Sequence, residues 1–316
     1  MNGIDGINGM DRLINKIIAT KNPTVAGLDP RLEYIPEKIV EGSFKKYGKG
    51  LRGAADVFYE YNKILIDALC EVVPAVKPQS AYYEMLGHEG VKALDKTVNY
   101  ARKKGMFVVV DGKRNDIAST AEAYAEAYLS GTKIDGKKIR SFAADGLTVN
   151  GYLGSDGIMP FVKSCEKDGS IIFVLVKTSN KSSGEYQDRD MCGDSAYVRM
   201  AEMVSLWGES TVGKYGYSSV GAVVGATYPS QLVELREKFS NMFFLVPGYG
   251  AQGAGAKDIA GAFDKNGLGA LVNSSRAIMC AWQKTGKNGT DLAEAAYAEA
   301  IHMRDDIQAN INKLVK

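Results

Sequence analysis

Short apolar runs alternate along the chain with longer segments of helical hydrophobic periodicity. The runs place Val, Ile, Leu and Phe at consecutive positions, which is typical of strands buried on both faces of a parallel sheet. Eight such runs predict strands at Thr24–Asp29, Val72–Lys77, Phe107–Asp111, Gly146–Val149, Ile171–Lys177, Val220–Val224, Phe243–Val246 and Ala270–Asn273.

Amphipathic patterns predict a helix after each of these strands. The predicted helices are Ala54–Cys70, Glu84–Lys103, Asp116–Leu129, Asp156–Glu166, Ser195–Trp207, Ser230–Lys238, Ala256–Asp264 and Leu292–Asn312. A further helix, Gly9–Ala19, precedes the first strand. We expect Tyr34–Arg52 to be an insertion between a strand and its helix, and Ser179–Asp194 to be a long polar loop.

Repeated strand–helix units without a break in composition predict an α/β fold. We expect a single (β/α)8 TIM barrel with an extra N-terminal helix, forming one domain over residues 1–316. The alternative is an open, doubly wound sheet. A dinucleotide-binding sheet of that kind carries GxGxxG after its first strand, whereas here the first strand ends in GLDP. The barrel is therefore favoured.

Charge and composition narrow the class of protein. The 39 basic and 37 acidic residues give a net charge of +2, which argues against bulk electrostatic binding to nucleic acid or a membrane. The sequence has no apolar run long enough for a transmembrane helix, and its first residues lack the pattern of a secretory signal. Four scattered cysteines and two histidines predict reduced thiols, a cytoplasmic location and no Cys/His metal site.

Charged residues stand at the ends of the first three predicted strands, where the active site of such a barrel lies. They are Asp29, Lys77 and Asp111, with Lys113 just beyond. Side chains two apart on an extended chain share a face, so we expect Asp111 and Lys113 to point the same way. Charges gathered there need partners, and an interleaved network keeps each group ionised. Asp116 either joins this network or caps the next helix.

A glycine-rich loop, PGYGAQG, follows the seventh predicted strand, and Arg276 follows the eighth. Barrels often bind phosphate at this place, where backbone N–H groups and a planar guanidinium suit an anion. The alternative is that the glycines only make turns and that Arg276 only caps a helix.

Several motifs resemble those of the orotidine 5'-phosphate decarboxylases. VVVDGKRNDIAST is similar to the most specific motif of that family, and GLDP, VKPQ, LVKTSN, PGYGAQGA and NSSRAI resemble its other motifs in the same order. The resemblance covers about Pro23 to Met279 and is greatest to the longer, bacterial-type branch.

The resemblance implies decarboxylation of orotidine 5'-phosphate to uridine 5'-phosphate (UMP), the last step of de novo UMP synthesis. It implies no metal or organic cofactor, and a homodimer with shared active sites. Lys113 would protonate C6, Asp111 would lie beside the substrate carboxylate, and Lys77 and Asp29 would contact the ribose and hold the charged network. The resemblance also implies three further sets of contacts: Asp116, Ile117 and Thr120 to the neighbouring subunit's site, Ser179 to the pyrimidine amide edge, and Gln252, Arg276, Gly250 and Gly253 to the phosphate.

Three other functions are compatible with a barrel of this kind. A magnesium-dependent phosphosugar synthase tends to carry an acidic residue on the second strand, where Lys77 stands here. A Schiff-base aldolase needs a lysine held neutral, and carboxylates around Lys113 favour the charged form instead. The non-enzymatic alternative is a protein that only binds a phosphorylated ligand. In the enzyme, the loop Ser179–Asp194 is expected to act as a lid.

Overall fold

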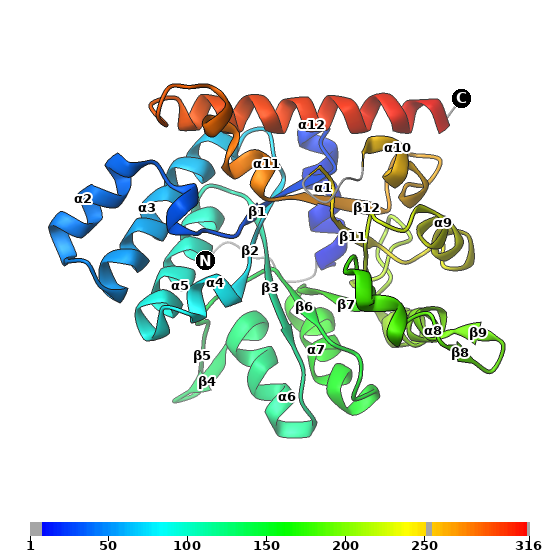
Figure 1. Ribbon diagram of the computed structural model, residues 1–316. Coiled ribbons are helices and arrows are strands. Elements are labelled where there is room, and N and C mark those ends of the chain that lie inside the picture. Colours follow the sequence, from blue (N-terminus) through cyan, green and yellow to red (C-terminus); the bar gives the residue numbers. More distant parts are fainter. Residues whose placement is uncertain (1–7, 251–254, 315–316) are drawn as a thin grey trace.

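The computed structural model describes residues 8–250 and 255–314. Its centre is a closed barrel of parallel strands in the order β1-β12-β11-β10-β7-β6-β3-β2, with helices around it (Figure 1). The strands are β1 Thr24–Leu28, β2 Ala75–Pro78, β3 Phe107–Arg114, β6 Gly146–Val149, β7 Ile171–Lys177, β10 Val220–Val224, β11 Phe244–Pro247 and β12 Ala270–Ser274. The predicted (β/α)8 barrel is confirmed.

The outer layer consists of helices between the strands, and α12 runs along one side of the molecule (Figure 1). The α-helices are α1 Gly9–Thr20, α2 Glu37–Tyr47, α3 Leu51–Leu69, α4 Ser80–Glu84, α5 Gly87–Lys103, α6 Ala118–Ala125, α7 Ser155–Asp168, α8 Ala196–Gly208, α9 Pro229–Lys238, α10 Ala256–Ile259, α11 Arg276–Met279 and α12 Leu292–Leu314. Short 3-10 turns are η1 Leu32–Tyr34, η3 Lys181–Glu185, η4 Glu209–Thr211, η5 Ala260–Ala262 and η6 Ala281–Lys284, and η2 Glu126–Ser130 is a π-helical turn.

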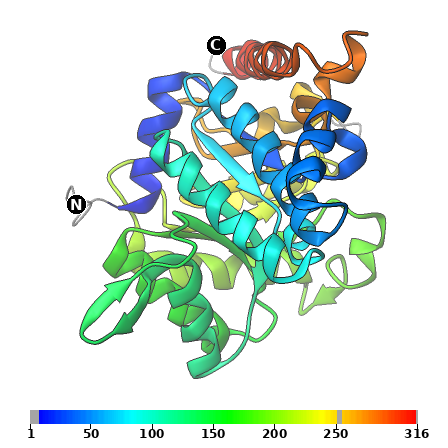
Figure 2. The same cartoon turned by 90° about the vertical axis from the view of Figure 1, so that its left-hand side faces the viewer.

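The extra N-terminal helix α1 closes the end of the barrel opposite the strand tips. Its Met10, Leu13 and Ile14 are fully buried, in one cluster with Phe107 and Ile171 of the barrel strands. The side chain of Asn8 caps α1 by accepting hydrogen bonds from the N–H groups of residues 10 and 11. In Figure 2, α1 is the dark-blue helix on the left, beside the N-terminus. Because α1 covers one end of the barrel, we expect the functional site at the opposite end.

Several element boundaries differ from the sequence prediction. The second strand begins at Ala75 because the N–H groups of Val72 and Val73 still bond to Leu69 O and finish the preceding helix. The predicted helix Glu84–Lys103 is broken between α4 and α5, where Gly87 has φ +62°. A hairpin that the pattern did not predict, β4 Thr132–Ile134 with β5 Lys137–Ile139, is exposed at every position and so lacks the alternation that marks a half-buried strand.

The two segments expected to be irregular contain local structure. Residues 34–52 include α2 and the start of α3. Residues 179–194 include η3 and most of a short hairpin, β8 Asp190–Met191 with β9 Asp194–Ser195. That this second segment acts as a lid stays a prediction.

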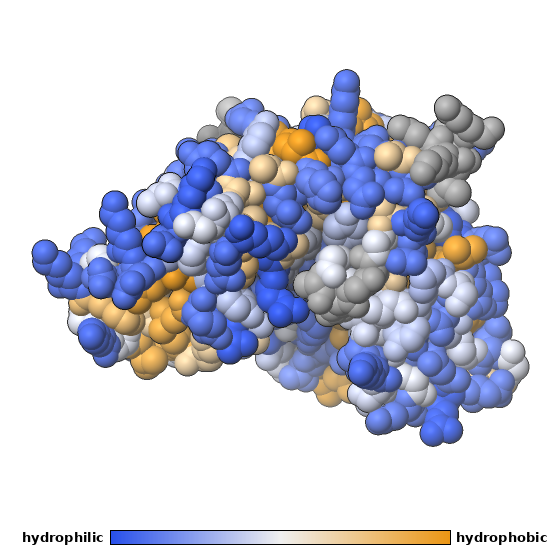
Figure 3. Space-filling model, turned by 45° about the horizontal axis from the view of Figure 1, so that its top comes forward, coloured by the Kyte–Doolittle hydropathy of each residue, from blue (hydrophilic) through white to orange (hydrophobic). Residues whose placement is uncertain are grey.

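The surface is mainly hydrophilic on the face drawn in Figure 3, with hydrophobic residues gathered mostly on the left, the side on which α2 to α5 lie in Figure 1. None of the helices within the described ranges has the length and apolar character that a membrane span requires.

Candidate active site

Asp111 on β3 is the centre of a charged cluster at the open end of the barrel. Its Oδ2 lies 2.8 Å from Nζ of Lys77 on β2, and its Oδ1 lies 2.6 Å from Nζ of Lys113. The hydroxyl of Thr148 on β6 donates a hydrogen bond of 2.8 Å to the same Oδ1. Three neighbouring strands therefore hold one carboxylate through both of its oxygens, as the predicted charged network requires.

The end of β3 is irregular, and this irregularity brings Lys113 to Asp111. The pairing of β3 with β6 shifts register between Val110 and Arg114, and Lys113 has φ +48°, in the left-handed region that non-glycine residues seldom adopt. The Lys113 N–H donates to Thr148 Oγ1 at 3.0 Å, which holds this bend. The two side chains share a face as predicted. The reason is a bulge rather than the plain alternation of an extended strand.

The neighbouring charges shift the pKa values of Asp111 and Lys77. Burial alone would raise the pKa of Asp111, but the ammonium groups of Lys77 and Lys113 bring it well below its usual value. Burial alone would lower the pKa of Lys77, but the carboxylates of Asp111 and Asp29 raise it. Both groups are therefore charged at neutral pH. The side chain of Lys113 is 45% exposed, so its ammonium is held by Asp111 yet open to a ligand.

Two buried acceptors lie beside this cluster without a hydrogen-bond donor among the described residues. They are Oδ1 of Asp29, just after β1, and Oδ1 of Asn273 on β12, the strand that pairs with β1. Buried oxygens of this kind are normally satisfied. They suit a ligand that brings hydroxyl donors to this side of the barrel mouth.

The predicted anion site lies where β11 and β12 end. Gly250 has φ +74°, and a Cβ placed on it would lie 3.9 Å from Cβ of Ala277, next to Arg276 at the start of α11. The structure thus brings together Gly250 and the segment of Arg276, which are 26 positions apart in the sequence. Gln252 and Gly253 lie outside the described residues.

Ser179 lies on the opposite side of the barrel mouth from β1, just after β7. Its carbonyl accepts a hydrogen bond of 3.3 Å from the hydroxyl of Thr227, which follows β10. Ser179 is half-buried. Lys177 contacts two residues of the loop that contains Ser179, namely Ser183 and Asp188.

Asp116, Ile117 and Thr120 lie beyond the charged cluster. Asp116 Oδ1 accepts a hydrogen bond from the Ile117 N–H at 2.8 Å, and no ion pair joins it to a lysine or arginine within residues 8–250 and 255–314. The alternative that Asp116 caps the next helix is wrong, because Ile117 is the N-cap residue and contributes no side-chain bond. Ile117 and Thr120 are exposed, Ile117 by 54%.

Sequence reasoning missed Thr148 and Asn273 as site residues. Thr148 comes second to last in a predicted strand whose tip carries no charge, and Asn273 is the last residue of another. The signal available for both was their polar side chain near the end of an apolar run, at the carboxyl end of a barrel strand.

A closed parallel barrel with ionised side chains converging on one carboxylate at its strand ends defines an enzyme of the TIM-barrel class. The family model described as "Orotidine 5'-phosphate decarboxylase / HUMPS family" matches residues 51–286. The chain belongs to this family, which confirms the resemblance seen in its motifs.

Curated relatives and a solved structure extend the similarity over nearly the whole chain. The orotidine 5'-phosphate decarboxylase of Caldicellulosiruptor bescii is 40% identical over 97% of this chain and 100% of its own length. That of Rhodopirellula baltica is 42% identical over 92% of this chain and 96% of its own. The structure of the OMP decarboxylase of Leishmania donovani matches with a TM-score of 0.73 and 28% identity, covering 97% of this chain and 99% of that one.

Proposed function

We propose that the protein converts orotidine 5'-phosphate to UMP and CO2, a step of pyrimidine biosynthesis. The observation that carries the proposal is the Lys77–Asp111–Lys113 cluster, with the Lys113 ammonium 2.6 Å from a carboxylate and open to a ligand. The full-length similarity to decarboxylases supports the choice of substrate. Lys77 stands where the magnesium-dependent synthases of this fold carry an acidic residue, which disfavours that alternative.

The reaction breaks the bond between C6 and the carboxylate and leaves the electron pair on C6. No neighbouring carbonyl delocalises this charge, so a fixed ammonium beside C6 stabilises the transition state more than the bound substrate. Lys113 supplies that ammonium and then donates its proton to C6. Asp111 lies beside the departing carboxylate and, through Lys77, keeps the cluster rigid.

The remaining roles rest on the buried acceptors beside the cluster and on the resemblance of the motifs to those of the family. The unpartnered oxygens of Asp29 and Asn273 accept hydrogen bonds from ribose hydroxyls, and Lys77 completes this side. Ser179 contacts the pyrimidine amide edge. Arg276 and Gln252, with the N–H groups near Gly250 and Gly253, bind the phosphate.

Turnover without metal tests the proposal most directly. Groups of three or more His, Cys, Asp or Glu that could hold a metal ion are absent from the described residues, and both oxygens of Asp111 already have cationic partners. We expect the fall in absorbance of orotidine 5'-phosphate to proceed at the same rate with and without EDTA. Activity that EDTA abolishes and magnesium restores would contradict the metal-free scheme, and no turnover under either condition would refute the proposed activity.

Arg276→Ala should raise KM at least tenfold, because a guanidinium that grips phosphate acts in the bound substrate as well as in the transition state. Arg276→Lys should recover part of the loss, since it keeps the charge without the planar fork. Arg304→Ala, which removes an arginine paired with Asp305 on α12, is the matched control and should leave KM unchanged. An unaltered KM in Arg276→Ala would place the phosphate elsewhere.

We also propose a homodimer in which each subunit lends Asp116 to the active site of the other. Apolar side chains are exposed around Asp116: Ile117 by 54% and Leu153 by 46%. Ile117 follows Asp116 in the chain. Leu153 is also close to Asp116, because a Cβ placed on Gly157 would meet Asp116 O at 3.0 Å and Leu153 Cβ at 3.2 Å. An apolar surface beside a charged site is typical of an interface.

The cellular location and the domain organisation are two further proposals. The four free cysteines fit a reducing compartment, so we propose a cytoplasmic location. The organisation of residues 1–316 as one domain also stays a prediction.

A further inference from the structure

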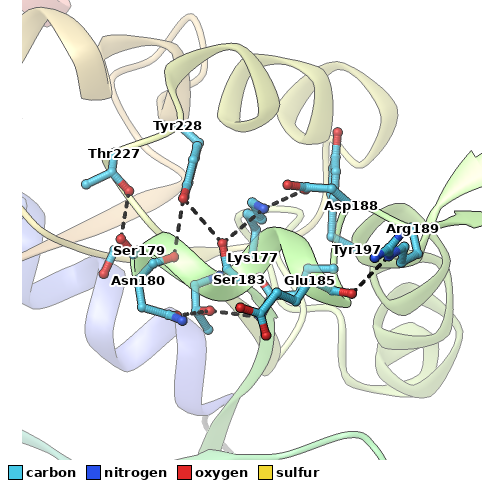
Figure 4. A network of polar contacts seen from close by, with 12 residues as sticks. Lys177, Ser179, Asn180, Ser183, Glu185, Asp188, Arg189, Tyr197, Thr227 and Tyr228 are labelled. Atoms are coloured by element: carbon cyan, nitrogen blue, oxygen red, sulfur yellow. Dashed lines mark hydrogen bonds and ion pairs between the residues drawn. The ribbon is translucent and has the colours of Figure 1, made fainter.

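Lys177, the last residue of β7, is a buried cation that the proposed chemistry does not use. Its side chain is 0% exposed, and its Nζ lies 2.5 Å from Asp188 Oδ1 and 3.2 Å from Ser183 Oγ. The same Nζ lies 4.5 Å from the ring centroid of Tyr228 (Figure 4). Asp188, by contrast, is 39% exposed. The ammonium is thus enclosed by its partners, and the carboxylate is the solvent-facing side of the pair.

Both polar partners of Lys177 belong to the β7–α8 loop, residues 178–195. Burying an ammonium costs free energy unless a carboxylate and hydrogen-bond acceptors remain beside it. Moving this loop away from the barrel would remove both partners at once and leave the ammonium buried and unpaired. The ion pair therefore holds the loop against the end of β7.

Ser179 lies next to this set of contacts, and its carbonyl accepts a hydrogen bond from Thr227, the residue before Tyr228 (Figure 4). Its Cα and N lie so close to Gly225 that a Cβ there would meet both at 2.9 Å. Tyr228, whose ring covers the Lys177 ammonium, donates from its hydroxyl to Asn180 O at 3.3 Å. Ser183 donates to the same Tyr228 hydroxyl at 3.4 Å. Through Ser183 and Tyr228, the contacts of Lys177 therefore reach the backbone of Asn180, the residue that follows Ser179.

We infer that Lys177 is a positioning residue, which fixes Ser179 against the pyrimidine end of the substrate through the Asp188–Ser183–Tyr228 contacts. The inference rests on the proposed role of Ser179. Lys177 lies on the β7–β10 side of the barrel, whereas Arg276 follows β12. Loss of the Lys177 side chain should therefore weaken binding of the base and leave binding of the phosphoribosyl part unchanged.

The test compares two ligands that differ by the base, UMP and ribose 5-phosphate. In Lys177→Met we expect the Kd of UMP to rise about tenfold, or ~1.4 kcal/mol, while that of ribose 5-phosphate stays within about twofold. Asp188→Asn, which removes the charge but keeps a hydrogen-bond acceptor beside the ammonium, should show the same selectivity, and it carries the test if Lys177→Met does not fold. Lys238→Met is the matched control, because Lys238 also pairs with this loop, at 3.2 Å from Asp194, but is 42% exposed. It should change neither Kd.

A double-mutant cycle with Ser179→Ala separates positioning from general support of the fold. In a Ser179→Ala background, Lys177→Met should add less than about a twofold loss of UMP affinity. Equal losses for both ligands, additive losses in the cycle, or unchanged UMP binding in Lys177→Met would overturn the inference while leaving Ser179 in its role. If Ser179→Ala itself leaves UMP binding unchanged, both the role of Ser179 and the inference fail.

Discussion

Lys113→Ala is expected to lower kcat by a factor on the order of a thousand or more while the protein still folds and binds UMP. Removing one preorganised electrostatic group commonly costs about a hundred- to a thousandfold, and Lys113 is also the proposed proton donor. The fold should survive because Asp111 keeps its ion pair with Lys77 and its hydrogen bond from Thr148. Steady-state kinetics and UMP titration measure the two effects separately.

Lys138→Ala is the matched control for this variant. Lys138 also pairs with one aspartate, Asp168, but on the outer surface, with its side chain 50% exposed. Its removal should leave kcat unchanged. If Lys113→Ala keeps more than about a tenth of the wild-type kcat, a barrier change of only ~1.4 kcal/mol, Lys113 does not have the proposed role.

Mixing the two inactive variants Lys113→Ala and Asp116→Ala is expected to restore activity, provided that subunits exchange. If Asp116 acts in the partner's site, one site of each mixed dimer carries both lesions and the other carries none. Random exchange makes about half of the dimers mixed, so activity should recover to roughly a quarter of the wild-type value. The rate is measured before and after exchange, with mixed dimers verified by differently tagged subunits.

Each variant incubated alone under the same conditions is the control, and neither should gain activity. In the alternative arrangement Asp116 serves its own subunit, so every site keeps one lesion. Verified exchange without any recovery would thus refute the shared site, yet it would leave the decarboxylase activity as proposed.

The residues of the charged cluster could be predicted because their position follows from local pattern. The apolar run Phe107–Val110 is buried at every position, and Asp111 ends it. In a barrel of parallel strands all carboxyl ends meet at one face. Recognising the strands therefore sufficed to place Asp29, Lys77 and Asp111 together, although the two residues of the Lys77–Asp111 pair are 34 positions apart.

Helix boundaries were less predictable, because they depend on contacts outside the helix. The pattern predicted a helix from Asp116, whereas α6 begins at Ala118, a residue with φ +44°. The chain before it follows the bulged end of β3 and packs beside Gly157 of α7. No periodicity in the sequence records that packing.

The sequence by itself determined the strand–helix alternation, the barrel and the set of polar residues at the strand ends, because burial on two faces and helical periodicity leave a local pattern in each segment. Only the tertiary structure decided which of these residues meet. The contacts around Lys177 depend on side chains of the β7–α8 loop and of Tyr228, which meet only in the folded barrel. The left-handed turn at Lys113 and the hydrogen bonds of Thr148 depend on the register between β3 and β6, whose paired residues are far apart in the chain. Such register is set by the closing of the barrel as a whole, and therefore leaves no local pattern from which it could be predicted.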